Sequence, residues 1–299
     1  MINISTLKRS RLEVMFWKIE KANWFFDLDR NELVEKVLEK IQNTADDVVG
    51  KGTAMAPVFG CFYFLKGKLS LRRNQPAKAL DDLLMAQKLF NEHKFIQQNY
   101  LYHISHVFEE IANSYLMLEP PNIDMASKYL SAAFTKASKK AENFYNLDIP
   151  SLIASIGRCY YIQGIQEKQL GNLSCAKEIF EKSIGYYTKA MALDTQMNLH
   201  KYDNYADKLV KRSESHVELG LLKVSGALSD AVKDIREADD LRENILQPPS
   251  YKCTHTPHLL GKFLCIKAKQ EYENKHKGKY YRINLDYPSQ NVSLPKPDP

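Results

Sequence analysis

Apolar side chains recur at helical spacing along most of the chain. In Asn31–Val49, for example, apolar residues return every three or four positions, and Glu and Lys occupy many of the positions between them. The same pattern continues from about residue 9 to residue 275, and no strand-like alternation of useful length appears before the last twenty residues. The pattern therefore predicts an all-α protein.

Proline and asparagine mark the places where several helices should begin. Pro76, Pro150 and Pro257 each follow closely on a polar residue, and Asn122 follows two prolines. Proline is tolerated in the first turn because the amide hydrogen that it lacks would have no partner inside the helix. These residues predict helix starts near positions 76, 122, 150 and 257.

One spacing of small and apolar residues occurs four times, with offsets of 0, 4 and 7. The four sets are Ala79, Leu83 and Ala86; Ala126, Leu130 and Ala133; Ala176, Phe180 and Ser183; and Ala231, Ile235 and Ala238. Each set follows a small residue on a preceding helix, in turn Gly67, Ala112, Gly164 and Gly220. Small residues at a fixed place on successive helices let the helices pack closely. The repetition predicts an array of helical hairpins.

This pattern resembles the tetratricopeptide repeat (TPR), in which a small residue stands at the eighth position and alanine, a large apolar residue and alanine follow at the twentieth, twenty-fourth and twenty-seventh. The unit Gly157–Ser183 fits best, with Gly164, Gly171, Ala176 and Phe180 in register. Successive units are 45, 52 and 56 residues apart, whereas the family period is 34. The proline that usually closes a unit is also absent, and Asn91 stands there in the first. The resemblance is to a long-helix variant, and it implies a right-handed α-solenoid of antiparallel helical hairpins.

The flanking sequence is expected to cap such an array, because end units would otherwise expose core surface. The expected divisions are N-terminal capping helices (1–54), four TPR-like hairpins (55–245), a C-terminal capping helix (246–278) and an extended or partly disordered tail (279–299). Three prolines in the last five residues preclude a helix there. Tyr280–Tyr287, with three tyrosines and two aliphatic residues, offers something to bury.

The resemblance also implies a binding surface. In TPR arrays the first helix of each pair lines a concave groove, chiefly through its second, fifth, ninth and twelfth or thirteenth positions. The residues at those positions are Phe64, Lys68 and Arg72; His106, Glu109 and Asn113; Arg158, Tyr161 and Lys168; and Glu214 with Leu221. This polar, aromatic and modestly basic mixture suits a peptide of some acidic character. The family's clamp for chaperone tails is not expected, because only Asn113 of its residue set is in place.

Little in the sequence indicates catalysis. No nucleophile elbow, phosphate loop or paired-cysteine motif occurs. Cys61 lies among phenylalanines, which should raise its pKa and make it inert. His106 and Glu110 are four residues apart, which suits either an acid–base pair or an ordinary surface pair on a helix. We therefore expect no enzymatic activity and no cofactor.

Four potential zinc ligands lie close together near the C-terminus: Cys253, His255, His258 and Cys265. Their spacing is not that of a recognised zinc motif. A loop followed by a helix, with Cys265 buried, is the favoured interpretation, and metal binding is the alternative.

The formal net charge of +6 is concentrated at one end, because residues 250–299 contain nine basic and four acidic residues. The basic residues are Lys252, Lys262, Lys267, Lys269, Lys275, Lys277, Lys279, Arg282 and Lys296, and Tyr280 and Tyr281 lie among them. Basic residues with interleaved aromatics can bind single-stranded nucleic acid or an acidic partner. A charged run on the last helix of an array is more often a solvated face, so nucleic acid is the lesser alternative.

The N-terminal segment has basic residues but no apolar stretch after them, which argues against a secretory signal. Thr53–Leu65, the longest nearly apolar run, is too short to span a bilayer. Five cysteines without close pairing argue against a disulfide scaffold and favour a reducing cytoplasm. A host cytosol reached by secretion without a cleaved signal would give the same features.

These observations favour a non-enzymatic scaffold that binds a protein segment or peptide in the concave groove of a TPR-like array. The alternative is a peptide-sensing regulator of the same fold that changes shape to release or capture a partner.

Overall fold

The computed structural model describes residues 4–28, 30–45, 56–91, 101–138, 148–200, 203–245 and 251–275. Within them lie eleven helices and no strand: α1 (Ile4–Asp27), α2 (Asn31–Ala45), α3 (Ala56–Arg72), α4 (Pro76–Asn91), α6 (Leu101–Met117), α7 (Ile123–Ser138), α8 (Asp148–Gln169), α9 (Leu173–Gln196), α10 (Asp203–Leu221), α11 (Ala227–Ile245) and α12 (Tyr251–Lys275). The expected all-α solenoid is confirmed. In this described part of the chain, no helix is both long enough and apolar enough to cross a membrane.

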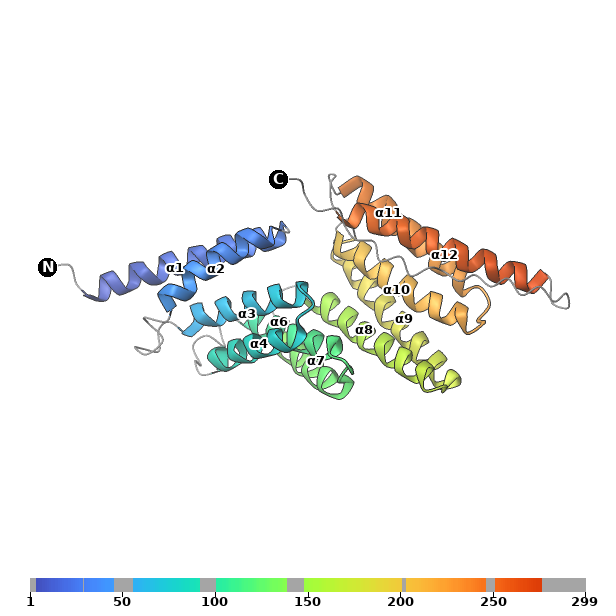
Figure 1. The fold of residues 1–299 in the computed structure, drawn as a ribbon, viewed down its shortest axis with the longest axis horizontal. Helices are drawn as coiled ribbons and strands as arrows, with labels where there is room; N and C mark the ends of the chain where they lie inside the picture. Colours follow the sequence, from blue (N-terminus) through green and yellow to red (C-terminus); the bar gives the residue numbers. More distant parts are fainter. Residues whose placement is uncertain are drawn as a thin grey trace, which may run out of the picture.

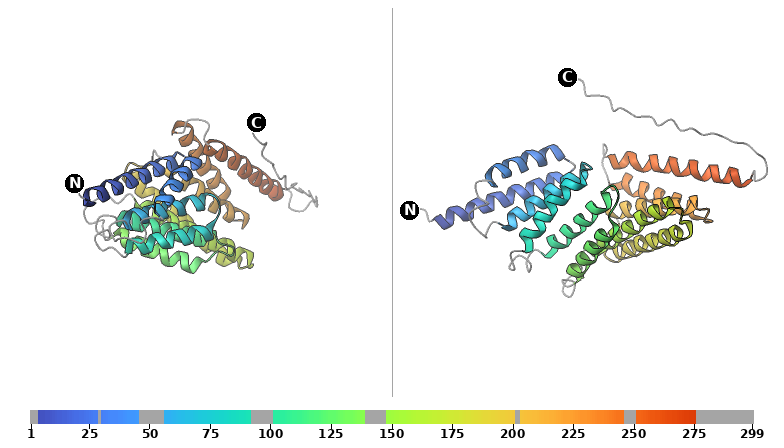
Figure 2. Two further views of the ribbon diagram at one scale, coloured as in Figure 1. Left: turned by 60° about the vertical axis from the view of Figure 1, so that its left-hand side comes forward. Right: turned by 60° about the horizontal axis from the view of Figure 1, so that its bottom comes forward.

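The helices pack as successive pairs: α1 with α2, α3 with α4, α6 with α7, α8 with α9, and α10 with α11. The second helix of each pair also packs against the first helix of the next pair, and α11 packs in this way against α12. The pairs follow one another in chain order from α1 at one end of the molecule to α12 at the other (Figures 1 and 2).

The repeated small residues lie where two helices of a pair approach most closely. A β-carbon added to Gly67 would lie 2.6 Å from Leu83, and one added to Gly164 would lie 2.7 Å from Phe180. All twelve residues of the four repeated sets are buried. The repeat in the sequence is therefore a helix-packing repeat.

The small residue of the fourth pair packs nearer the turn than Gly67 and Gly164 do. Gly220 lies against Leu228, where a β-carbon would come within 2.5 Å. Gly220 is the next-to-last residue of α10 and Leu228 is the second of α11, so the contact forms beside the turn.

Three of the four predicted helix starts are confirmed. Helix α4 begins at Pro76, α8 begins two residues before Pro150, and α7 begins after Asn122, whose side-chain oxygen accepts a hydrogen bond from the Met125 amide at 3.0 Å. The fourth is wrong, because α12 begins at Tyr251 and contains Pro257. Pro257 is the seventh residue of α12 and lies inside the helix, where it lacks the amide hydrogen for one backbone bond.

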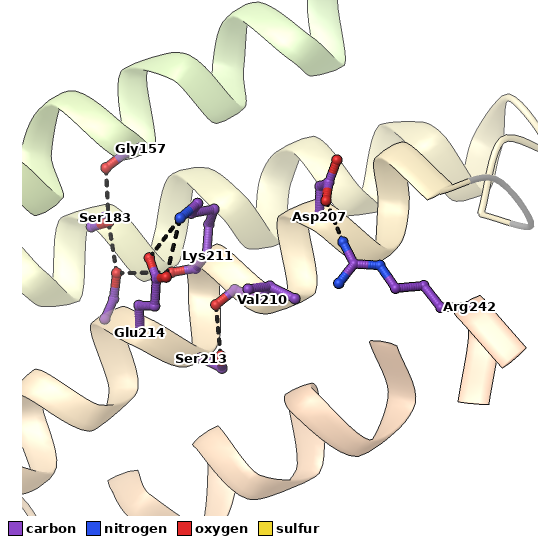
Figure 3. A network of polar contacts seen from close by, with 9 residues as sticks. Gly157, Ser183, Asp207, Val210, Lys211, Ser213, Glu214 and Arg242 are labelled. Carbon is purple, nitrogen blue, oxygen red and sulfur yellow. Dashed lines mark hydrogen bonds and ion pairs between the residues drawn. The ribbon is translucent and has the colours of Figure 1, made fainter. Parts of the chain in front are cut away.

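A buried arginine joins the last three helices. Arg242 on α11 is 2% exposed, and its Nε donates to Asp203 of α10 at 3.1 Å. Its Nη1 donates to the Thr256 hydroxyl of α12 at 2.8 Å, and its Nη2 donates to Asp207 (Figure 3). These bonds fix α12 on the α10–α11 pair.

Candidate functional site

The predicted binding residues lie on α3, α6, α8 and α10, the first helices of four successive pairs. Each of these helices contacts the next one, and α1 contacts α3. We call the surface at these contacts the inner face. It contains polar and aromatic side chains from all four helices.

Two predicted cations on α3 contact the end of α1. Arg72 Nη1 donates to the Phe26 carbonyl at 2.6 Å, and the guanidinium carbon lies 3.4 Å from the centroid of the Phe26 ring. Lys68 Nζ lies 4.4 Å from the same centroid and 5.5 Å from that of Phe64. Both cations therefore interact with aromatic faces across the α1–α3 contact.

A short series of polar contacts connects α6 to α8. Asn113 Nδ2 donates to Glu110 Oε2 at 3.2 Å, and Arg158 Nη1 donates to Asn113 Oδ1 at 3.3 Å. Burial and the neighbouring Glu109 charge raise the pKa of Glu110, while the Lys68 charge on α3 acts in the opposite direction. The carboxyl of Glu110 is therefore sensitive to charges on its own helix and on α3.

Glu109 is buried at the contact between α6 and α8. It is 6% exposed, and its Oε1 accepts hydrogen bonds from the Ser155 hydroxyl at 2.6 Å and the Ser151 hydroxyl at 3.0 Å. Its Oε2 lies 3.4 Å from His106 Nδ1. Burial raises the pKa of Glu109, but the bonds from His106, Ser155 and Ser151 together outweigh burial and hold that pKa below its ordinary value. In this structure Glu109 holds α6 against α8, and the predicted contact of Glu109 with a peptide stays a prediction. The histidine's close carboxylate is this residue, and not Glu110 as considered above.

The contact between α8 and α10 is also polar. Lys168 Nζ lies 2.5 Å from Glu218 Oε2. Tyr161, half-buried on α8, packs against the Phe180 ring with centroids 6.0 Å apart. Burial, with the Glu214 and Glu218 charges, raises the pKa of the Tyr161 hydroxyl, so it is a neutral hydrogen-bonding group at physiological pH.

Glu214 is held along its own helix. Lys211 Nζ donates to both of its carboxylate oxygens, at 3.1 and 3.0 Å, beside the Ser183 hydroxyl that donates to the Gly157 carbonyl (Figure 3). Leu221, the last predicted residue, is 43% exposed.

The predicted residues lie on four helices that contact one another in succession, but Glu109 is buried and carboxylates lie beside two of the predicted cations. Lys68, Arg158 and Lys168 each have an anionic, amide or aromatic neighbour within the array. The carboxylates Glu110 and Glu218 were not among the predicted groove residues, yet Glu218 pairs with Lys168 and the Lys68 charge acts on Glu110. The inner face is therefore of mixed charge and not basic.

The structure describes only part of the predicted zinc site near the C-terminus. Cys265 is exposed, so its predicted burial is wrong, and α12 replaces the expected loop. Among the side chains that are described, no three metal-ligating residues gather. Those of Cys253 and His255 lie outside this set, so the four-residue zinc hypothesis stays a prediction. Cys61 is buried, and burial raises its pKa to about 12, as expected, while its low reactivity stays a prediction.

The exposed charges on α12 are mixed. Lys262, Lys269 and Lys275 are exposed, and so are Glu271 and Glu273. The tail residues Lys277, Lys279 and Arg282 lie outside the described residues. Nucleic-acid binding stays the lesser prediction.

No protein-family model matches the chain, and no curated protein matches it in sequence. Among solved structures, the apo form of RapI aligns over 88% of this chain and 73% of its own, with 13% identity and a TM-score of 0.50. NprR in complex with its cognate peptide NprX aligns over 94% and 91%, with 13% identity and a TM-score of 0.40. A signal-transduction ATPase with a tetratricopeptide repeat sensor, PH0952 from Pyrococcus horikoshii, aligns over 89% of this chain but 35% of its own, with 17% identity and a TM-score of 0.46. The likeness to RapI is one of fold.

Proposed function

We propose that the chain is a non-enzymatic scaffold that binds a segment of another protein along the inner face. The observation that carries the proposal is the continuity of this face across four helices. The contacts Asn113 to Arg158 and Lys168 to Glu218, for example, bring together side chains that are 45 and 50 residues apart in sequence. A long surface built from short repeats suits an extended ligand. The cytoplasmic location stays a prediction.

The charge balance of the face narrows the ligand. An acidic peptide would have to displace Glu218 from Lys168 and would meet the carboxyl of Glu110 beside Asn113. A segment carrying both acidic and basic residues can instead pair with cations and carboxylates in turn, and Phe64 and Tyr161 can anchor apolar side chains between them. We therefore propose a segment of mixed charge, in place of the acidic peptide that the sequence suggests.

Site-specific photocrosslinking tests this proposal. A photoreactive phenylalanine analogue is placed at Phe64 on α3 or, as a matched control, at Phe134 on α7, which is 39% exposed on the second helix of a pair. After crosslinking in cell extract, the adducts are identified by mass spectrometry, and segments of the captured protein are titrated against the purified chain. The proposal expects one protein to crosslink from Phe64 and not from Phe134. Equal capture at both positions would overturn it.

A second candidate is a regulator whose array changes shape on binding. It is favoured by polar bonds between successive first helices, such as Arg158 to Asn113 and Lys168 to Glu218, which can exchange partners with a ligand. Small-angle scattering of the chain with and without the captured segment separates the two. A scaffold keeps its radius of gyration, and a regulator becomes more compact or more open.

A further inference from the structure

The outward side of α12 carries a stripe without a charged residue. Its members are exposed and follow one another at intervals of one, three or four positions: Pro257, Gly261, Leu264, Cys265, Ala268 and Tyr272. The opposite side of the helix carries Thr256, Leu259 and Phe263, which are buried toward α10 and α11. An end helix is expected to turn a polar side outward, so this stripe indicates that something covers it.

Gly261 has the same place on α12 as Gly164 has on α8, where the glycine contacts the second helix of the pair. In α8, Cys159 and Ile162 lie five and two positions before Gly164 and pack with α6 and α7. In α12, Thr256 and Leu259 lie at the same offsets before Gly261 and contact the preceding pair. The two glycines therefore point the same way from their helices.

The two glycines differ in what they meet. Phe180 of α9 lies against Gly164, whereas a β-carbon on Gly261 would meet nothing within 4 Å in the described part of the chain. Helix α12 thus has the packing face of a first helix, and its second member is not among the described elements.

We propose that Tyr280–Tyr287 of this chain covers the stripe as an extended segment antiparallel to α12. Its sequence alternates: Tyr281, Ile283, Leu285 and Tyr287 are apolar or aromatic, and Arg282, Asn284 and Asp286 lie between them. A period of two places the first set on one edge of an extended chain and the polar set on the other. Such a segment has one apolar edge to bury and follows directly after α12.

The lengths agree with this arrangement. Gly261 lies fourteen positions before Lys275, or about 21 Å along the helix, and eight extended residues span about 26 Å. Alternate residues of an extended chain are about 6.6 Å apart, and residues four apart on a helix are about 6.0 Å apart along its axis. Successive apolar residues of the segment can therefore contact successive members of the stripe. In this register Tyr281 lies near Tyr272, and Tyr287 lies near Gly261. His276–Lys279, which includes Gly278, is left for the turn.

Hydrogen–deuterium exchange of the full chain, read by mass spectrometry, tests the proposal. In Gly261→Lys a long charged side chain stands in the middle of the stripe, and the open space around Gly261 means that it disturbs nothing described. Gly185→Lys is the matched control, because Gly185 is a helical, exposed glycine on α9 that also meets nothing within 4 Å. In the native chain, amides 280–287 should be protected from exchange, and Gly185→Lys should keep this protection. In Gly261→Lys the same amides should exchange at least about tenfold faster. Leu285→Asp should lose the protection as well.

Alkylation of Cys265 gives a second measurement. A covered stripe makes Cys265 react more slowly than the exposed Cys175, and Gly261→Lys should remove the difference. Unprotected amides at 280–287 in the native chain, or protection that survives Gly261→Lys, would overturn the proposal. Protection that grows with protein concentration would also overturn it, since it assigns the stripe to a second copy. A tail that exchanges freely while Cys265 stays protected would assign the stripe to another partner.

Discussion

Gly67 and Leu83 are packed so closely that a β-carbon on the glycine would lie 2.6 Å from the leucine Cγ. Leu83 is fully buried, and the Ala79 carbonyl lies 3.3 Å from the same point, so neither neighbour can move away cheaply. We expect Gly67→Ala to destabilise the chain by about 1–3 kcal/mol, as overpacking of a core does. Urea unfolding followed by circular dichroism measures the change.

Gly185→Ala is the control for this substitution. Gly185 is also helical but meets nothing within 4 Å, so alanine there should be neutral or should stabilise by up to about 1 kcal/mol. Equal destabilisation by both variants would contradict the packing role of Gly67.

The Arg212–Asp234 pair between α10 and α11 should also be sensitive. Arg212 Nε and Nη2 donate to the two carboxylate oxygens of Asp234 at 2.8 and 2.7 Å, and Asp234 is 3% exposed. Asp234→Ala should cost about 3 kcal/mol of unfolding free energy, because it leaves a largely buried guanidinium without its carboxylate. Chemical denaturation of Asp234→Ala and of Arg212→Met/Asp234→Leu compares the two cases. The double variant should recover most of the loss, and failure to do so would show that the charges themselves are needed.

Glu109 should contribute to acid sensitivity. Its pKa in the folded chain lies below the ordinary 4.5 because of His106, Ser155 and Ser151. A depressed carboxylate pKa gives stability that is present above pH 4.5 and is lost as the pH falls through the folded value. Glu109→Gln should therefore be less stable at neutral pH and lose less stability between pH 5 and the acid limit, as measured by thermal unfolding across pH. The exposed Glu178→Gln should follow the native curve. A Glu109→Gln curve parallel to the native one would contradict the assignment.

The cysteines should separate by reactivity. Burial raises the pKa of Cys61 to about 12 and that of Cys159 to about 11, whereas Cys175 is exposed. At pH 8 iodoacetamide should label Cys175 in the folded chain and reach Cys61 and Cys159 only in denaturant. Peptide mapping measures the three rates. Fast labelling of Cys61 in the folded chain would show that α3 opens.

The sequence was most informative about contacts within a pair. Ala126, Leu130 and Ala133, for example, were identified from spacing alone and are buried on α7. Such contacts depend on helical periodicity, which a single segment already displays. The contact of Gly220 with Leu228 could not be read from the repeated spacing, because the turn between α10 and α11 places Leu228 there.

Contacts between pairs were beyond sequence reasoning. Glu109 occupies a position that faces the groove in the family, yet Ser151 and Ser155, more than forty residues later, bury it. No local pattern relates those residues, and only the rotation between successive pairs decides whether a polar position meets solvent or the next helix. The exposure of Cys265 has the same origin, because it depends on which side of α12 meets α11.

The two kinds of joint described above give the array unequal mechanical stiffness. Within a pair, close apolar contacts such as Gly164 on Phe180 resist deformation, and dissolved ions do not weaken them. Neighbouring pairs are joined by apolar contacts, such as those of Cys159 and Ile162 with α6 and α7, and along the inner face by partly solvated polar contacts such as Lys168 to Glu218. Salt screens only the polar contacts, so a rise in ionic strength should loosen the inner face first, while the apolar contacts keep the pairs stacked.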